Sequence, residues 1–191
     1  MTAPNDATTP ASWERYRAAL HTLARLKVDP RVQTKLDLSG VVQQTLLEAF
    51  LARDRWQNAD DGQQLAYLRR ALAHNLTDAL RYFATDKRNQ ELERPLADAA
   101  GLSSSRVQAW LAADQTSPSE AVARSERDLL LADALNELPD AQREALILQH
   151  WHSWSLAEIG ERLDRSPAAV AGLIKRGLQA LRERLQNWSD P

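Results

Sequence analysis

The sequence predicts an all-α protein made of two small helical bundles joined by a flexible linker. Aliphatic residues and alanine dominate the 191-residue chain, which has only 6 glycines and 8 prolines. No segment shows the alternation of apolar and polar residues that is typical of a half-buried strand, and apolar residues recur instead at helical spacing. The polar, serine-rich segment 91–126 interrupts this pattern and predicts the linker.

The first bundle is expected at residues 12–90, after a disordered leader at 1–11. Helices are predicted over 12–26, after a cap at Asp37, and over 65–83, with a polar turn before the last. The residues expected to face inward are Trp13, Tyr16, Leu20 and Leu23 in the first helix, Val42, Leu46, Ala49 and Phe50 in the second, and Leu65, Leu68, Leu72, Leu76 and Phe83 in the third.

The second bundle is expected at residues 127–188. Pro139 should separate its first helix from a second helix over 140–151, because proline cannot continue a helix. The residues expected to face inward are Leu129, Leu130, Ala134 and Leu138 in the first of these helices, Ala145, Leu146 and Leu148 in the second, and Val107, Trp110 and Leu111 in a short docking helix within the linker.

The segment 155–185 predicts a helix-turn-helix. Ser155 and Glu158 have the spacing of a capping box. The sequence Asp-Arg-Ser at 164–166 has the length of the turn in such motifs, and Pro167 suits the first position of the second helix. The residues expected to face inward are Leu156, Ile159 and Leu163 in the first helix and Val170, Ile174, Leu178, Leu181 and Leu185 in the second.

The N-terminal part of the second helix has the composition of a DNA-reading surface. A recognition helix enters the major groove by its N-terminal residues, and Lys175 and Arg176 can neutralise phosphates. Gly172 and Gly177 each cost a helix about 1 kcal/mol, which either close packing or close approach of DNA explains. The alternative is an amphipathic hairpin with a solvated basic face. The residues on the candidate face are Ala168, Ala169, Ala171, Gly172, Lys175 and Arg176.

The net charge of −2 is distributed unevenly along the chain. Residues 65–88 carry five basic and two acidic groups, residues 89–140 carry four basic and ten acidic groups, and residues 141–191 carry seven basic and six acidic groups. Two weakly basic segments therefore flank an acidic middle of net charge −6. Because binding depends on local potential, we expect modest affinity for DNA alone and a larger partner that supplies the rest.

Several other classes of protein are excluded by composition. The chain has no cysteine, and His150 and His152 lie two residues apart without a third ligand, so no metal or other cofactor is expected. No glycine-rich phosphate loop or nucleophile motif indicates an enzyme. No apolar run approaches the roughly 20 residues of a membrane span, and the N-terminus lacks the pattern of a signal peptide. We therefore expect a cytoplasmic protein without a membrane partner.

Six stretches, taken in order, resemble one known family. They are DLSGVVQQTLLEAF at 37–50, YLRR at 67–70, NLTDALR at 75–81, LPDAQRE at 138–144, SLAEIG at 155–160, and the segment 166–177. Together they resemble the extracytoplasmic-function group of bacterial RNA polymerase sigma factors. These are small initiation factors with two helical domains, usually called sigma-two and sigma-four. The resemblance covers about residues 12–188.

The resemblance implies a factor without catalysis that directs core RNA polymerase to promoters and helps to open them. It implies contacts with the polymerase β′ clamp and β flap, and it adds an anti-sigma factor as a further partner. The residues implied at the minus-thirty-five duplex are Arg162, Arg165, Ser166, Ala168, Ala169, Ala171, Gly172, Lys175 and Arg176. Those implied at the minus-ten element are Trp56, Arg69, Arg70, His74 or Asn75, Arg81, Lys87 and Arg88. Those implied at the polymerase clamp are Asp37, Val42, Gln43, Gln44 and Leu47. The acidic linker is implied to follow the RNA channel of the polymerase.

Two departures from the family pattern affect these assignments. One extra residue between Tyr67 and Asn75 leaves open whether His74 or Asn75 faces the flipped base. Family members often carry Lys or Arg where Ala171 and Leu173 stand, so phosphate and shape contacts must replace most readout of base edges by arginine.

Other interpretations of the same residues remain open. Trp56 suits a core anchor as well as a stacking platform, and Asn75 suits a polar surface position. Arg69 and Arg70 are also typical of ordinary solvent-exposed charges on a helix, and the acidic middle is also typical of a plain linker. The whole chain also suits a stand-alone helix-turn-helix regulator, or a helical interaction protein that no longer binds DNA.

Overall fold

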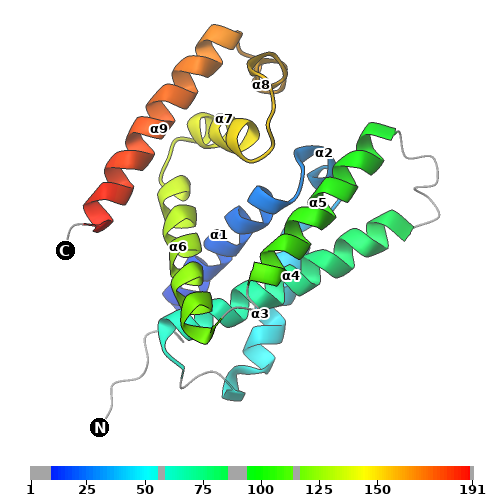
Figure 1. Cartoon of the computed structure of the whole chain (residues 1–191), viewed down its shortest axis with the longest axis vertical. Helices are drawn as coiled ribbons and strands as arrows, with labels where there is room; N and C mark the ends of the chain where they lie inside the picture. Colours follow the sequence, from blue (N-terminus) through cyan, green and yellow to red (C-terminus); the bar gives the residue numbers. More distant parts are fainter. Residues whose placement is uncertain (1–9, 56–58, 86–93, 114–116, 190–191) are drawn as a thin grey trace. The chain divides into compact units, whose positions relative to one another are not determined.

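The computed structural model describes residues 10–55, 59–85, 94–113 and 117–189, and all regular secondary structure in these ranges is helical (Figure 1). The prediction of an all-α protein is therefore confirmed. The elements in chain order are α1 (Pro10–Lys27), α2 (Pro30–Gln33), α3 (Leu38–Leu51), η2 (Arg53–Arg55), α4 (Asp61–Thr85), α5 (Arg94–Ala113), α6 (Pro118–Asn136), α7 (Asp140–His150), α8 (Leu156–Leu163) and α9 (Pro167–Ser189).

The chain forms two compact units, Met1–Leu129 and Leu130–Pro191, which we call the N-terminal and C-terminal units. The boundary falls within α6. Of the leader expected at 1–11, residues 1–9 lie outside the described ranges, and Pro10 begins α1.

In the N-terminal unit, α4 is the central helix and packs against α1, α3 and α5 (Figure 1). It begins at Asp61, four residues before the predicted start, because the side chain of Asp60 accepts a hydrogen bond from the backbone N–H of Gln63 at 2.7 Å. Such a side-chain cap satisfies a donor in the first helical turn. The predicted inward residues Leu65, Leu68, Leu72, Leu76 and Phe83 are all buried, as are Tyr16, Leu20 and Leu23 of α1.

The start of α3 follows the prediction, but the expected burial of a residue in its last turn does not. Asp37 caps the helix by accepting a hydrogen bond from the N–H of Gly40 at 2.9 Å, and Val42 and Ala49 are buried. Phe50 was expected to face inward but is 48% exposed. It lies in the last turn of α3, where its ring packs edge-on against the ring of Trp13, with 6.2 Å between the ring centres, and the guanidinium of Arg53 lies 4.6 Å from the centre of its ring.

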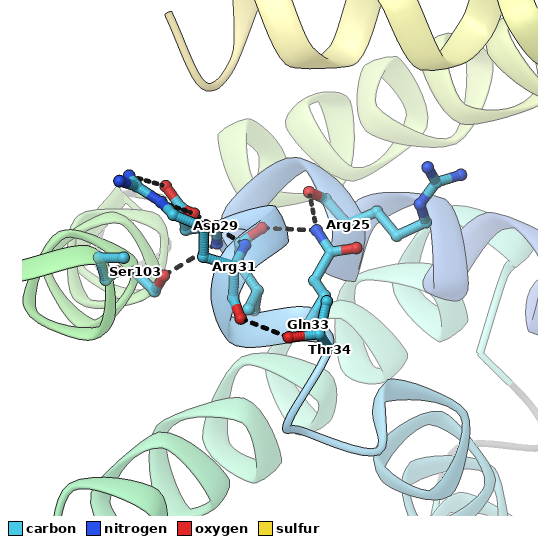
Figure 2. Close-up of polar contacts among 8 residues, drawn as sticks. Arg25, Asp29, Arg31, Gln33, Thr34 and Ser103 are labelled. Atoms are coloured by element: carbon cyan, nitrogen blue, oxygen red, sulfur yellow. Dashed lines mark hydrogen bonds and ion pairs between the residues drawn. The ribbon is translucent and has the colours of Figure 1, made fainter. Parts of the chain in front are cut away.

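The single-turn helix α2 connects α1 to α5 through buried polar contacts (Figure 2). The carboxylate of Asp29, which is 1% exposed, accepts hydrogen bonds from the backbone and the guanidinium of Arg31. The backbone N–H of Asp29 donates to Ser103 Oγ of α5 at 2.9 Å, and Ser103 Oγ donates to the carbonyl of Ala99. These hydrogen bonds satisfy buried polar groups that would otherwise destabilise the contact between α2 and α5.

The segment expected as a flexible linker, 91–126, differs from that expectation. Most of its described part is helical and belongs to the N-terminal unit, as α5 and the first half of α6. The serines that indicated a linker include Ser103, which is buried against Asp29. The short docking helix predicted around Trp110 is part of the longer α5. The buried residues of α5 are Ala99, Ala100, Ser103, Val107 and Trp110.

In the C-terminal unit, α9 packs against α7 and α8. Ala145, Leu146 and Leu148 of α7 are buried, as predicted. The close contact between α7 and α9 explains one of the two glycines in α9. A Cβ atom at Gly177 would lie 2.8 Å from Leu146 Cδ1, so a larger residue there would have to displace the buried side chain of Leu146. A Cβ atom at Gly172 would meet only the side chain of Arg176, at 3.3 Å from Nη1.

Within the described ranges, no helix combines the length and apolarity needed to cross a membrane. In the same ranges, no three histidine, aspartate or glutamate side chains gather closely enough to hold a metal ion. His150 is exposed and His152 is buried.

Candidate nucleic-acid interface

The helix-turn-helix begins with a reciprocal cap on α8. Ser155 Oγ accepts a hydrogen bond from the N–H of Glu158 at 3.2 Å, and the Glu158 carboxylate accepts one from the N–H of Ser155 at 2.7 Å. Both bonds of a capping box are therefore present, as the sequence predicted. The helix ends at Asp164, whose φ of 52° and ψ of 55° place it in the left-handed region. Aspartate tolerates this conformation better than most residues.

The turn between α8 and α9 depends on a close backbone approach. The N–H of Arg165 donates to the carbonyl of Gly160 at 2.9 Å. A Cβ atom at Gly160 would lie only 2.6 Å from the carbonyl oxygen of Arg165, so the turn accepts no side chain there. Ser166 then caps α9 by accepting a hydrogen bond from the N–H of Ala169 at 3.3 Å. These contacts fix the start of α9 relative to α8.

The two faces of α9 follow the sequence prediction. Val170, Ile174 and Leu181 are buried, as is Ile159 of α8, while Leu178 is half-buried. The residues exposed along the turn and the outer face of α9 are Arg165, Ser166, Ala168, Ala169, Ala171, Lys175 and Arg176. The unit therefore presents a surface of small side chains with cations at both ends.

Arg162 is fixed in place by neighbours on other elements. Its Nε donates to a carboxylate oxygen of Glu144 at 3.2 Å, and its guanidinium lies 5.8 Å from the centre of the Trp154 ring. The side chain is still 37% exposed, so it can approach a phosphate at the edge of this surface. Trp154 was not singled out in the sequence, although an apolar residue directly before an N-cap is a known helix-start signal.

In the N-terminal unit, the outer face of α4 exposes Arg70, His74 and Arg81, three of the residues that the resemblance implies at the minus-ten element. Tyr82 beside them is 72% exposed and was missed, because an aromatic residue in a helical pattern is usually part of a core. Among the remaining predicted residues, Trp56, Lys87 and Arg88 lie outside the described ranges.

His74 and Asn75 are placed differently. Asn75 Nδ2 donates to Thr45 Oγ1 at 3.0 Å and to a carboxylate oxygen of Glu48 at 2.9 Å, so its side chain links α4 to α3. His74 is exposed. Of the two candidates left open by the sequence, His74 is therefore the one that α4 presents to solvent.

Arg69 does not lie on the solvent-exposed surface of α4, although both interpretations of this residue from the sequence place it there. Arg69 is 1% exposed. Its Nε donates to Asp128 Oδ2 at 2.6 Å, and its guanidinium lies 4.7 Å from the centre of the Trp110 ring. Burial of this cation is possible because α6 supplies the opposite charge. The sequence gives no local signal for a partner 59 residues away.

The predicted polymerase-binding residues divide into buried and exposed groups. Val42 is 1% exposed and belongs to the core, so it cannot contact a partner directly. Asp37 caps α3, and Gln44 Nε2 donates to Glu48 Oε1 at 2.7 Å along the helix surface. Gln43 is exposed. The exposed large apolar residues toward the end of α3 are Leu47, Phe50 and Leu51.

Comparisons with known proteins agree with this arrangement. Residues 128–181 match the family described as "Sigma-70, region 4". The chain is 29% identical over 176 residues to an RNA polymerase sigma-E factor of Streptomyces coelicolor, covering 90% of this chain and 81% of that protein. It is 31% identical over 175 residues to an RNA polymerase sigma-E factor of Streptomyces antibioticus, with the same coverage. It is 31% identical over 162 residues to the RNA polymerase sigma factor CarQ of Myxococcus xanthus, covering 82% and 83% of the two chains. The search of solved structures gave no significant match.

The all-helical fold, the helix-turn-helix and the match to region 4 together define the class of the protein. It is a helical transcription factor that binds DNA through a helix-turn-helix. More specifically, the chain belongs to the family of RNA polymerase sigma factors and is of the extracytoplasmic-function type. It directs core polymerase to promoters and assists the initiation of transcription. Sigma factors act as initiation factors without catalysing a reaction, which agrees with the expectation that the chain is not an enzyme.

Proposed function

We propose that this sigma factor holds a promoter at two places, with α9 at the minus-thirty-five duplex and α4 at the minus-ten element. The observation that best supports the first contact is the exposed N-terminal face of α9, since a recognition helix enters the major groove by this end. The exposed cations of α4 support the second contact. This division of roles is the one implied by the resemblance to sigma-two and sigma-four.

At the minus-thirty-five element, Arg165, Lys175 and Arg176 contact phosphates, and Arg162 lies close to one at the edge. Ser166, Ala168, Ala169, Ala171 and Gly172 allow the backbone to approach the duplex. Small apolar side chains can contact thymine methyl groups, and phosphate contacts set the orientation. Sequence preference therefore rests mainly on shape and methyl contacts.

At the minus-ten element, Arg70 and Arg81 hold the backbone of the melting strand, and His74 faces the flipped base. Tyr82 adds an aromatic surface, because single-stranded DNA is held by aromatic stacking beside cations. Trp56, Lys87 and Arg88 keep the roles that the resemblance implies. Arg69 joins them only in the open state that we propose below.

The polymerase contact involves the outer surface of α3. Gln43 and Leu47 face the β′ clamp, while Asp37 and Gln44 contribute through the cap and the helix surface. The C-terminal unit contacts the β flap. An anti-sigma factor would cover these same surfaces in the cytoplasm, and co-purification of the chain from its own cells is the test for such a partner.

Reconstituted transcription tests the proposed function. Purified core polymerase and the chain are supplied with a library of duplex promoter fragments from the source genome. We expect transcripts that start at defined sites only when both proteins are present. A stand-alone regulator would instead bind duplex fragments without polymerase and would leave the pattern of core transcripts unchanged.

A further inference from the structure

Helix α5 and residues 118–128 of α6, which we call the cover, lie on the N-terminal unit over a buried charge. Arg69 and Trp110 meet the same carboxylate, since Trp110 Nε1 donates to Asp128 Oδ2 at 3.1 Å and Arg69 Nε donates to it at 2.6 Å. We call these three residues the latch. An arginine remains charged inside a protein, so the carboxylate of Asp128 stabilises the buried Arg69.

Two further contacts show how closely the cover fits. A Cβ atom at Gly62 would lie 2.6 Å from Val122 Cγ1 and 2.9 Å from Glu126 Oε1, so the start of α4 and the first half of α6 approach each other closely at this point. At the other side, Ser103 of α5 accepts the hydrogen bond from the N–H of Asp29 (Figure 2). The cover is thus held at three separate positions.

The latch is crowded with positive charge. Lys27 Nζ lies 5.2 Å from the centre of the Trp110 ring. Burial lowers the pKa of Lys27, the charges of Arg69 and Arg106 lower it further, and Asp128 acts in the opposite direction. Arg69 and Lys27 therefore both interact favourably with the carboxylate of Asp128, and an anion such as a DNA phosphate can compete with it for Arg69.

The cover lies within the acidic middle of the chain, although it contains four basic and four acidic residues and the acidic excess comes from the residues around it. Residues 89–140 carry four basic and ten acidic groups, and the resemblance assigns this segment to a channel of the polymerase. One segment cannot pack on α4 and run along a channel at the same time. The docked state described here and the state bound to polymerase must therefore differ.

We propose that the cover is a releasable lid, closed by the latch in the free chain and opened when the promoter complex forms. This inference rests on the proposed function. In the closed state Asp128 takes the place of a phosphate on Arg69. In the open state Arg69 joins Arg70 and Arg81 on a continuous basic surface of α4.

A disulfide that holds the lid closed tests its release. The chain has no cysteine, and the built Cβ of residue 62 lies 2.6 Å from a γ atom of residue 122, so the two positions are adjacent, as a disulfide between them requires. In the Gly62→Cys/Val122→Cys variant, we expect the oxidised form to give at least ten-fold fewer promoter-specific transcripts than the form reduced with dithiothreitol. Equal yields from the two forms would show that the cover stays docked during initiation and would overturn the proposal.

Hydrogen exchange of the free chain tests the latch independently of transcription. Asp128→Asn removes the negative charge of Asp128 beside the buried Arg69, so we expect amides of residues 94–113 to exchange at least ten-fold faster, with α9 unchanged. Glu120→Gln is the matched control, because Glu120 is an exposed acid on the same helix. Unchanged protection of α5 in Asp128→Asn would rule the latch out. If the wild-type chain directs no transcripts, the proposed function and the role of release fail together, while the exchange result still decides whether the latch holds.

Discussion

At the scale of single residues, Lys27 has the clearest dependence on pH. Burial lowers its pKa below the ordinary lysine value of 10.5. Between the lowered pKa and 10.5 the unfolded chain binds more protons at this site than the folded chain, so the free energy of unfolding rises with pH in this window. Below the window both states are protonated and the contribution is constant.

The prediction compares wild type with Lys27→Met. We expect the free energy of unfolding of wild type, relative to that of the variant, to increase as the pH is raised toward 10.5. Urea denaturation at several pH values measures this difference, and the other titrating groups cancel in it. Parallel profiles for the two proteins would contradict the account of Lys27.

Asn75 and His74 allow a second test at this scale. Asn75→Ala removes the two hydrogen bonds to Thr45 and Glu48, and we expect a loss of about 1–2 kcal/mol in the free energy of unfolding, because each hydrogen bond contributes about 0.5–1.5 kcal/mol net and these two are partly exposed. His74→Ala should leave stability unchanged and weaken binding of single-stranded minus-ten DNA. The reverse pattern in denaturation and binding assays would assign the base contact to Asn75.

Single residues also show what sequence can and cannot predict. The caps at Asp37 and Ser155 were predicted correctly, because a cap bonds to a backbone group two or three residues away. The burial of Arg69 was missed, because it depends on Asp128 and Trp110, which reach it only through the packing of other helices.

At the scale of elements, the turn between α8 and α9 is the most constrained feature. In Gly160→Ala, the new Cβ would meet the carbonyl oxygen of Arg165 at 2.6 Å, and a backbone atom cannot move aside cheaply. We expect a loss of about 1–3 kcal/mol in stability, the usual cost of overpacking, and weaker binding to duplex DNA.

Gly101→Ala is the matched control for that prediction. A Cβ atom at Gly101 meets nothing within 4 Å, and alanine is favoured over glycine in a helix by about 1 kcal/mol. We therefore expect this variant to be as stable as wild type or more stable. Thermal or urea denaturation measures both variants, and equal stability of Gly160→Ala and Gly101→Ala would refute the role given to the turn.

Helices were predicted well where their apolar residues recur in long patterns, as in α1, α4, α7 and α9. The segment 91–126 was misjudged, because serine is typical of linkers and its helix-forming contacts are tertiary. Ser103 is buried only because α2 offers it a backbone N–H. The expected burial of Phe50 was wrong for a similar reason, because the helical period alone does not reveal which side chains a neighbouring helix covers.

At the scale of the whole molecule, binding to the promoter is electrostatic and depends on salt. We predict that Lys175→Ala with Arg176→Ala lowers the slope of log affinity against log salt by up to about two. Fluorescence anisotropy with a minus-thirty-five duplex, in the complex with core polymerase, measures the slope. Arg182→Ala, an exposed cation farther along α9, should leave the slope unchanged.

An unchanged slope in the double variant would place DNA on another surface of the C-terminal unit. The candidate surface of this unit was largely predictable from sequence, because the cap, the turn and the inward stripe of α9 all follow local rules. The corresponding surface of the N-terminal unit was less predictable, since the docked α5 and α6 decide which side chains of α4 remain exposed.

The most direct test of a sigma factor is its association with core polymerase. Purified chain and core polymerase are mixed and separated by size-exclusion chromatography, and the fractions are assayed on promoter DNA. We predict a single complex that elutes ahead of the free chain and starts transcripts at defined sites. Elution of the two proteins as separate peaks, with no promoter-specific transcripts, would contradict the assignment.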